Sequence, residues 1–77
     1  MTLSENFKII RLKLFLTQEE LAKQLNVSLS TVNRWETGKA RPNISTMKTI
    51  KLFCETHNLP YDEIESGWLN YNAEGDK

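Results

Sequence analysis

The sequence predicts an all-α fold of five helices, and three observations support this prediction. Several segments carry apolar residues at intervals of three and four, which is the spacing of one face of a helix. No segment alternates polar and apolar residues in the way a half-buried strand does. The composition, with 26% charged residues, 3 Gly and 2 Pro, is that of a globular protein and argues against disorder or low complexity. At 77 residues the chain is expected to form one small domain without room for a large pocket.

The first two helices are predicted from capping signals and apolar spacing. The first is expected to begin after an N-cap at Ser4 and to end near Leu14, with its buried side formed by Phe7, Ile10 and Leu14. The second begins at Thr17, because Glu20 follows three residues later and completes a capping box. It buries Leu21, Ala22 and Leu25, and Asn26 ends it in the left-handed conformation that Asn tolerates well.

The third helix is predicted from Leu29 to Glu36, with Ser28 as its N-cap and Gly38 as its left-handed stop. It buries Val32 and Trp35. A fourth helix begins at Asn43 or Ser45, since either residue can cap it, and it ends at Asn58. Its apolar stripe consists of Met47, Ile50, Phe53, Cys54 and His57.

A short fifth helix is predicted from Tyr61 to Ser66, followed by an aromatic segment from Trp68 to Tyr71. This segment either forms a dimer contact or completes the small core, and the sequence leaves both alternatives open. We expect the domain to span residues 1–71 and residues 72–77 to be a disordered tail.

The charges are balanced overall, with 10 Lys and Arg against 10 Asp and Glu, but they are unevenly distributed. Residues 1–51 carry nine cations and four anions, whereas residues 52–77 carry one cation and six anions. The first segment therefore has a charge of +5 and the second a charge of −5. This polarisation favours a basic binding surface with an acidic far side.

Composition also weighs against several classes of protein. A single Cys and a single His provide neither a metal site nor a catalytic pair, and Cys54 and His57 are expected to be core or helix-end residues. We therefore predict no enzyme activity, no cofactor and no metal. The chain contains no run of 18 apolar residues, so no membrane-spanning helix is predicted. The polar N-terminus lacks the hydrophobic core of a signal peptide. The lone cysteine agrees with a cytoplasmic protein.

The segment from Thr17 to Lys39 combines a short helix, a tight turn and a second short helix, which is the pattern of a helix-turn-helix. Ala22 is small where the two helices cross, and Asn26 suits the positive φ of the turn. Leu21, Leu25, Val27, Val32 and Trp35 seal the joint between the helices. Each residue alone is weak evidence, but the set at this spacing is specific.

From about Phe7 to Ile64 the chain resembles the lambda-repressor-like, Cro/C1-type domain of the Xre family. The resemblance rests on four stretches of sequence: LTQEELA, VSLSTV, RWETGK and the RP that follows. It implies five helices and binding to double-stranded DNA, usually as a homodimer. It further implies that Gln18 contacts the DNA backbone and that Arg11 and Glu36 form a structural ion pair. Phe15 and Asn26 depart from the glycines that are common at these positions in the family.

The outward face of the third helix provides candidates for reading bases in the major groove. Arg34 can donate two hydrogen bonds to guanine, Asn33 can read adenine, and Leu29 can contact a thymine methyl group. The complete base-reading set is Ser28, Leu29, Ser30, Asn33 and Arg34.

Residues around this face are candidates for contacts with DNA phosphates. Gln18 stands at the N-terminus of the second helix, where free amides and the helix dipole favour an anion. The complete phosphate set is Thr17, Gln18, Thr31, Thr37, Lys39, Arg41 and Asn43. Each cation that neutralises one phosphate adds about 0.9 to the salt slope of binding.

These features favour a sequence-specific transcriptional regulator, with repression as the expected mode, that binds double-stranded DNA as a homodimer. A sensor domain does not fit in 77 residues. The alternative is an antitoxin-type protein, whose C-terminal part binds a toxin while its helix-turn-helix regulates the operon that encodes the protein.

Overall fold

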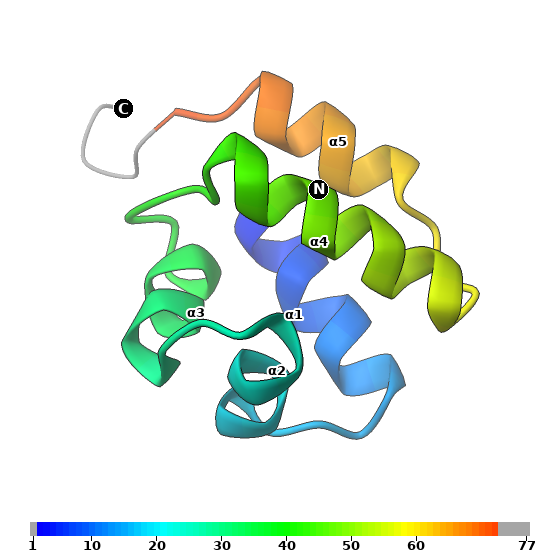
Figure 1. Ribbon diagram of the computed structural model, residues 1–77. Coiled ribbons are helices and arrows are strands. Elements are labelled where there is room, and N and C mark those ends of the chain that lie inside the picture. Colours follow the sequence, from blue (N-terminus) through cyan, green and yellow to red (C-terminus); the bar gives the residue numbers. More distant parts are fainter. Residues whose placement is uncertain (1, 73–77) are drawn as a thin grey trace.

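A computed structural model describes residues 2–72 and confirms the all-α fold (Figure 1). The five helices are α1 (Leu3–Lys13), α2 (Gln18–Leu25), α3 (Leu29–Glu36), α4 (Ile44–Thr56) and α5 (Asp62–Leu69). No strand occurs among residues 2–72. The expected tail lies almost entirely outside the described residues, since only Asn72 of it is included. None of the described helices is long and apolar enough to cross a membrane.

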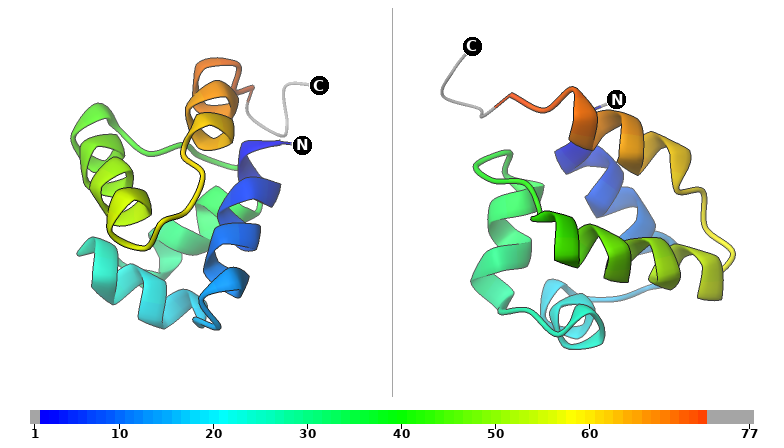
Figure 2. Two further views of the ribbon diagram at one scale, coloured as in Figure 1. Left: turned by 90° about the vertical axis from the view of Figure 1, so that its right-hand side faces the viewer. Right: turned by 45° about the horizontal axis from the view of Figure 1, so that its top comes forward.

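Helix α1 contacts both α3 and α5. Helix α2 packs against α3 on one side and against α4 on the other. The two views of Figure 2 place α5 beside the start of α1, at the end of the molecule away from α2. Helix α2 and the C-terminal helix therefore occupy opposite ends of the domain.

One hydrophobic core joins all five helices. The ring of Phe7 in α1 stacks on Trp35 in α3, with ring centroids 5.1 Å apart and an interplanar angle of 26°. This contact fixes the inner face of α3 and so determines which residues of that helix face solvent. The buried apolar side chains are Leu3, Phe7, Ile10, Leu21, Ala22, Leu25, Val32, Trp35, Met47, Ile50, Phe53, Cys54 and Ile64.

The predicted N-cap of the first helix was wrong. The cap is Thr2, whose hydroxyl accepts a hydrogen bond from the Glu5 amide at 3.2 Å while the Glu5 carboxylate accepts one from the Thr2 amide at 2.8 Å. Thr2 stands three residues before Glu5, which is the spacing of a capping box, and the earlier start allows Leu3 to be buried. The helix ends at Lys13, and Leu14, predicted to be buried, is the C-cap and only partly buried. For α4, Asn43 is the cap and its side chain accepts from the Thr46 amide at 2.8 Å.

The predicted end of the fifth helix was also wrong, because α5 continues through Gly67 to Leu69. A Cβ atom at Gly67 would lie 3.1 Å from the Cα and Cβ of Leu3. The glycine therefore allows close packing between α5 and the start of α1, rather than ending the helix. As a result, Trp68 lies within a helix and its side chain packs against the core.

Within residues 2–72, four residues connect or end helices with a positive φ. Asn26 (59°) and Gly38 (78°) do so where the sequence predicts, and Asn58 (55°) follows the end of α4. Phe15 adopts φ 57° between α1 and α2 although it is bulky, and its side chain is 93% exposed. The chain therefore accepts strain at Phe15 without gaining packing from its ring.

Candidate nucleic-acid interface

Helices α2 and α3 form a compact helix-turn-helix whose geometry is set by local hydrogen bonds. The Thr17 hydroxyl accepts from the Glu20 amide at 3.1 Å, and the Glu20 carboxylate accepts from the Thr17 amide at 2.8 Å. The hydrogen bond from the Thr17 amide to the carboxylate lowers the pKa of Glu20 below its usual value. After the left-handed Asn26, the Val27 amide donates to the Ala22 carbonyl at 2.9 Å and closes the turn. The capping box and the turn thus hold α3 at a fixed angle to α2.

The five predicted base-reading residues all lie on the exposed side of α3 or at its cap. Ser28 caps the helix through its hydroxyl, which accepts from the Thr31 amide at 3.1 Å. Asn33 and Arg34 are exposed in the second turn, and Leu29 is 48% exposed although it is apolar. Because Val32 and Trp35 are buried, the structure brings together Ser28, Leu29, Ser30, Asn33 and Arg34 on one continuous surface.

The ion pair between Arg11 and Glu36 joins α1 to the end of α3. The guanidinium Nε donates to Glu36 Oε2 at 2.7 Å and Nη2 donates to Oε1 at 3.0 Å. The Arg11 side chain is 14% exposed and that of Glu36 only 1%. The hydrogen bond to Glu36 raises the pKa of Arg11, so the guanidinium remains charged. A third bond, from Nη1 to the Leu16 carbonyl at 2.9 Å, holds the chain between α1 and α2.

Gln18 links this ion pair to the exposed face of α3. Its Nε2 donates to Glu36 Oε1 at 3.1 Å, which orients the amide, and its Oε1 accepts from Asn33 Nδ2 at 3.4 Å. Since one Gln18 amide group makes both bonds, the buried carboxylate determines which atom Gln18 presents to Asn33. The expectation that Gln18 contacts the DNA backbone did not include this connection.

The other residues of the predicted phosphate set lie at the N-cap of α2, within α3 and in the segment between α3 and α4. Thr17 and Asn43 use side-chain oxygens as helix caps, and Thr31 shares a hydrogen bond of 2.8 Å with Ser28. The Thr37 hydroxyl donates to the Asn33 carbonyl at 2.9 Å. Lys39 is exposed in the loop after α3. Arg41 lies further along the same loop, with its guanidinium carbon 4.0 Å from the ring centroid of Trp68.

Comparisons with known proteins agree with this geometry. A family model described as "Helix-turn-helix" matches residues 7–64, which is well over half of the chain. The chain belongs to the helix-turn-helix family. The resemblance to its Cro/C1-type, Xre members is confirmed. This is a family of DNA-binding transcription regulators.

One curated relative of this helix-turn-helix chain is the "HTH-type transcriptional activator BcrR" of Enterococcus faecalis. The two sequences are 39% identical over 67 residues, which is 87% of the present chain. The helix-turn-helix chain spans 31% of the length of that relative. No solved structure gave a significant match.

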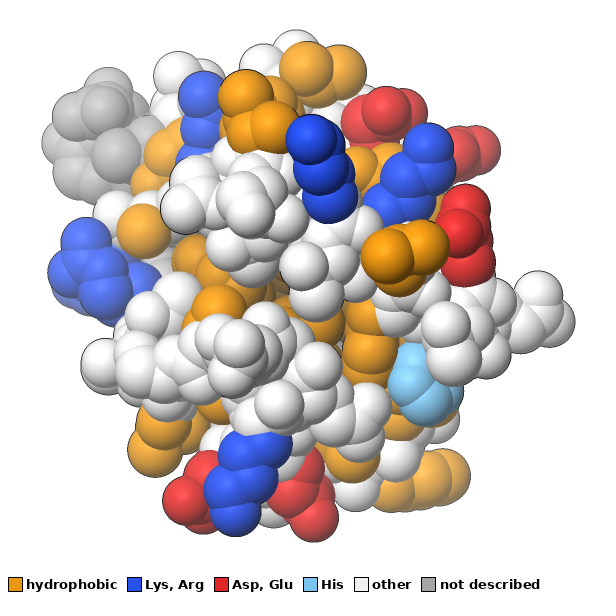
Figure 3. All heavy atoms as spheres, in the orientation of Figure 1, with side chains coloured by type: hydrophobic (Ala, Val, Ile, Leu, Met, Phe, Trp, Pro, Cys, Tyr) orange, Lys and Arg blue, Asp and Glu red, His pale blue; other side chains and the backbone are white. Residues whose placement is uncertain are grey.

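The surface of the helix-turn-helix domain reflects the charge distribution along its sequence. In Figure 3, Lys and Arg side chains lie over α4 and beside the loop between α3 and α4, while acidic side chains gather at the upper right near the start of α5. The first turn of α5 carries Asp62, Glu63 and Glu65. Acidic residues also occur at the start of α2, where the helix dipole stabilises the negative charges of Glu19 and Glu20.

Cys54 and His57 lie at the C-terminal end of α4, opposite to its N-cap Asn43. Cys54 is fully buried, and burial raises the pKa of its thiol. His57 is the C-cap of α4, with its ring centroid 4.5 Å from that of Phe53. Among residues 2–72, no group of three His, Cys, Asp or Glu residues could hold a metal ion.

Proposed function

We propose that the chain is a sequence-specific regulator of transcription that reads the major groove of double-stranded DNA with α3. One observation supports this proposal: side chains that are able to read bases, Ser30, Asn33 and Arg34 among them, are exposed on α3, while its inner side is fixed by Val32 and Trp35. A helix presented in this way fits the width of the major groove. Because DNA is the partner, we propose the cytoplasm as the compartment, and no enzymatic role.

Arg34 and Asn33 are the residues that we propose to determine base preference. Arg34 has five N–H donors in a planar arrangement and fits the O6 and N7 acceptors of guanine. Asn33 fits adenine, and its amide is oriented by Gln18 at 3.4 Å. Leu29 is positioned to contact a thymine methyl group, and Ser28 and Ser30 complete the set at the N-terminus of α3.

The rim of α3 supplies the phosphate contacts of the proposed complex. Lys39 and Arg41 contribute charge, and Gln18 retains a second amide hydrogen beyond the one it donates to Glu36. Hydroxyl and amide donors are provided by Thr17, Thr31 and Asn43, and Thr37 donates to a phosphate when its hydroxyl exchanges the bond to the Asn33 carbonyl. With zero net charge over the chain, non-specific attraction to DNA is expected to be weak.

Selection of bound sequences from a random duplex library at fixed salt tests the proposal. We expect one enriched motif, and a library without enrichment would contradict a specific regulator. Arg34→Ala should then lose about 1–3 kcal/mol of preference for the selected guanine. Lys8→Ala removes an exposed cation from α1 and is the matched control, with preference unchanged. An unchanged preference in Arg34→Ala would remove Arg34 from the base-reading set.

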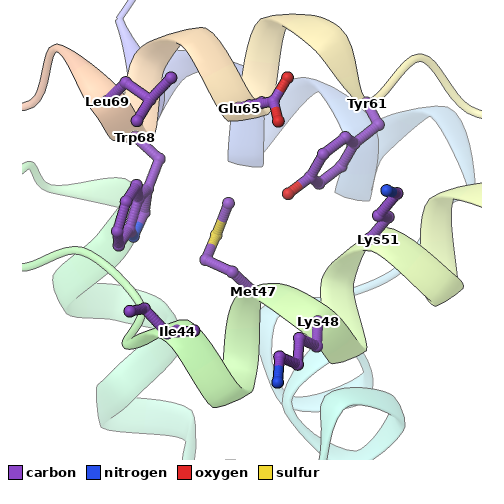
Figure 4. A pocket seen from close by; sticks show the side chains of 8 residues that line it. All are labelled: Ile44, Met47, Lys48, Lys51, Tyr61, Glu65, Trp68 and Leu69. Atoms are coloured by element: carbon purple, nitrogen blue, oxygen red, sulfur yellow. The ribbon is translucent and has the colours of Figure 1, made fainter.

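We also propose that the regulator is a homodimer formed through the groove between α4 and α5. The groove has a volume of about 230 Å³ and is lined by Ile44, Met47, Lys48, Lys51, Tyr61, Glu65, Trp68 and Leu69 (Figure 4). Its rims include Ile44 and Leu69, which are 65% and 67% exposed. Two copies related by a two-fold axis can bury these residues and pair the lysines of one with Glu65 of the other.

Sedimentation equilibrium tests the dimer. Leu69→Asp should shift the protein from dimer to monomer, whereas Leu12→Asp, at an exposed apolar position on α1, should not. A monomeric wild-type protein at concentrations that saturate DNA would contradict the dimer.

The direction of regulation and the antitoxin alternative call for separate experiments. We expected repression, but the relative is described as an activator. A reporter gene behind the selected operator distinguishes the two directions. A toxin-like reading frame beside the gene, and a stable complex between the two products, would favour the antitoxin.

A further inference from the structure

The loop between α3 and α4 is fastened to the end of α5 by three long-range hydrogen bonds. The Tyr71 hydroxyl donates to the Gly38 carbonyl at 3.1 Å, and the Trp68 indole Nε1 donates to the Pro42 carbonyl at 2.6 Å. In the opposite direction, Arg41 Nη1 donates to the Trp68 carbonyl at 2.6 Å. We call Trp68 and Tyr71 the aromatic clip. In Figure 1 the chain after α5 runs toward the side of the molecule on which this loop lies.

The loop depends on these contacts because it lacks regular structure of its own. Residues 40–43 belong to no helix, and Gly38 at φ 78° allows the chain to leave α3. Both carbonyls held by the clip belong to residues that flank Lys39 and Arg41. Fixing these carbonyls therefore limits the conformations available to the two cations between them.

Arg41 has a specific geometry within this arrangement. The planar guanidinium lies over the Trp68 ring at 4.0 Å and near the Tyr71 ring at 5.9 Å. Stacking occupies the face of the guanidinium, and the Trp68 carbonyl takes one N–H. The remaining N–H groups lie along the edge, which is the part that donates to phosphate oxygens. A stacked arginine loses less rotamer freedom when it binds a phosphate.

We propose that Trp68 and Tyr71 are positioning residues for DNA binding, which hold Arg41 and its loop in the conformation that meets the phosphate backbone. The inference rests on the proposed function, in which Arg41 contacts phosphate. It assigns the aromatic segment at the end of α5 a role in DNA binding, in addition to its packing on the core. The opposite possibility, that the clip keeps Arg41 away from DNA, gives the opposite result in the experiment below.

The test begins with two clip variants and one control variant of the full chain on the selected operator. Tyr71→Phe removes the bond to Gly38 and keeps the ring, and Trp68→Phe removes the bond to Pro42 and reduces the stacking surface. We expect each to weaken binding by about two- to fivefold. Asn70→Ala is the matched control, because it removes a bond of 2.9 Å to Ser66 within the same segment without touching the loop. It should bind as the wild type does.

The salt dependence of binding separates positioning from a general loss of stability. Arg41→Ala should reduce the salt slope by about 0.9. Trp68→Phe should reduce it in the same direction, and adding it to Arg41→Ala should cause no further loss of affinity. The base preference from library selection should stay the same in all of these variants. If Trp68→Phe does not fold, as judged by circular dichroism, Tyr71→Phe alone carries the test.

The outcomes distinguish failure of this inference from failure of the proposed function. If the wild type selects no DNA sequence, the proposed function fails. If the wild type selects a motif but both clip variants bind as Asn70→Ala does, the clip does not position the loop. Tighter binding by the clip variants would show that the clip withholds Arg41, and an unchanged salt slope in Arg41→Ala would remove its phosphate contact. Each of these results overturns the inference.

Discussion

Replacing Glu36 by glutamine tests whether the Arg11–Glu36 ion pair holds the helix-turn-helix in place. The substitution keeps the size of the side chain and removes its charge. Arg11 then remains charged with a side chain only 14% exposed, and its Nε and Nη2 groups lose the carboxylate to which they donate at 2.7 and 3.0 Å. The cost comes from this uncompensated guanidinium rather than from the lost attraction itself.

The expected loss of stability is about 3 kcal/mol. Breaking a buried pair costs about 3–5 kcal/mol, and the partial exposure of Arg11 places this case at the lower end. A domain of 77 residues has an unfolding free energy of about 4–12 kcal/mol, so the loss is a large part of the total. Urea unfolding followed by circular dichroism should show a midpoint about 3 M lower, since a domain of this size has an m value of about 1 kcal/mol/M.

Two further variants complete this experiment. Glu19→Gln removes an exposed carboxylate from α2 and should change stability by less than about 0.5 kcal/mol. Replacing both partners, as Arg11→Met with Glu36→Leu, should recover much of the loss because no charge is left buried. A Glu36→Gln protein within about 1 kcal/mol of the wild type would refute the argument.

Three other predictions follow from the strain, the packing and the caps of the helices. Phe15→Gly should leave stability unchanged or raise it by up to about 1 kcal/mol, because glycine relieves the strain at φ 57° and the ring is 93% exposed; Phe15→Ala keeps the strain and should give no gain in the same urea experiment. Gly67→Ala should destabilise the fold by about 1 kcal/mol in thermal unfolding, since its Cβ would lie 3.1 Å from the Cα of Leu3; a stabilised variant would show that α1 yields and that helix propensity prevails. The pKa of Glu20 is lower in the folded state, so its contribution is present above the unfolded pKa and is lost as the pH falls through the folded value; Glu20→Gln should remove this part of the acid dependence, and identical acid unfolding profiles would contradict it.

The sequence was most informative where structure depends on residues three or four positions apart. The capping box of Thr17 and Glu20, the cap at Ser28 and the left-handed Asn26 were all predicted, and with them the bounds of α2 and α3. The exposed face of α3 followed from the same pattern, because Val32 and Trp35 fix its inner side. At the N-terminus the same spacing connects Thr2 and Glu5, but we predicted the cap at Ser4.

Features that depend on distant residues could not be predicted from local patterns. The bond from Gln18 to Glu36 spans 18 positions, and that from Tyr71 to Gly38 spans 33. Nothing near Gly67 in the sequence indicates that Leu3 packs against it. The ion pair of Arg11 and Glu36 was expected only because the chain resembles a known family. Side chains from different helices meet through tertiary packing, which periodicity within one helix does not specify.

The contact of α1 with α5 has a consequence for synthesis of the protein on the ribosome. Helix α3 emerges before α5, but the start of α1 packs against Gly67, and Asn6 donates to the Glu63 carbonyl across 57 positions. Closing a loop between residues so far apart in the sequence costs conformational entropy, so this contact forms late in folding. A nascent chain therefore lacks the packing of α5 against α1, the helix whose Phe7 stacks on Trp35, until nearly all of the described residues have left the exit tunnel. A chain that stops before α5 lacks this support for α1, and through α1 for α3, so we expect its α3 to be held less firmly.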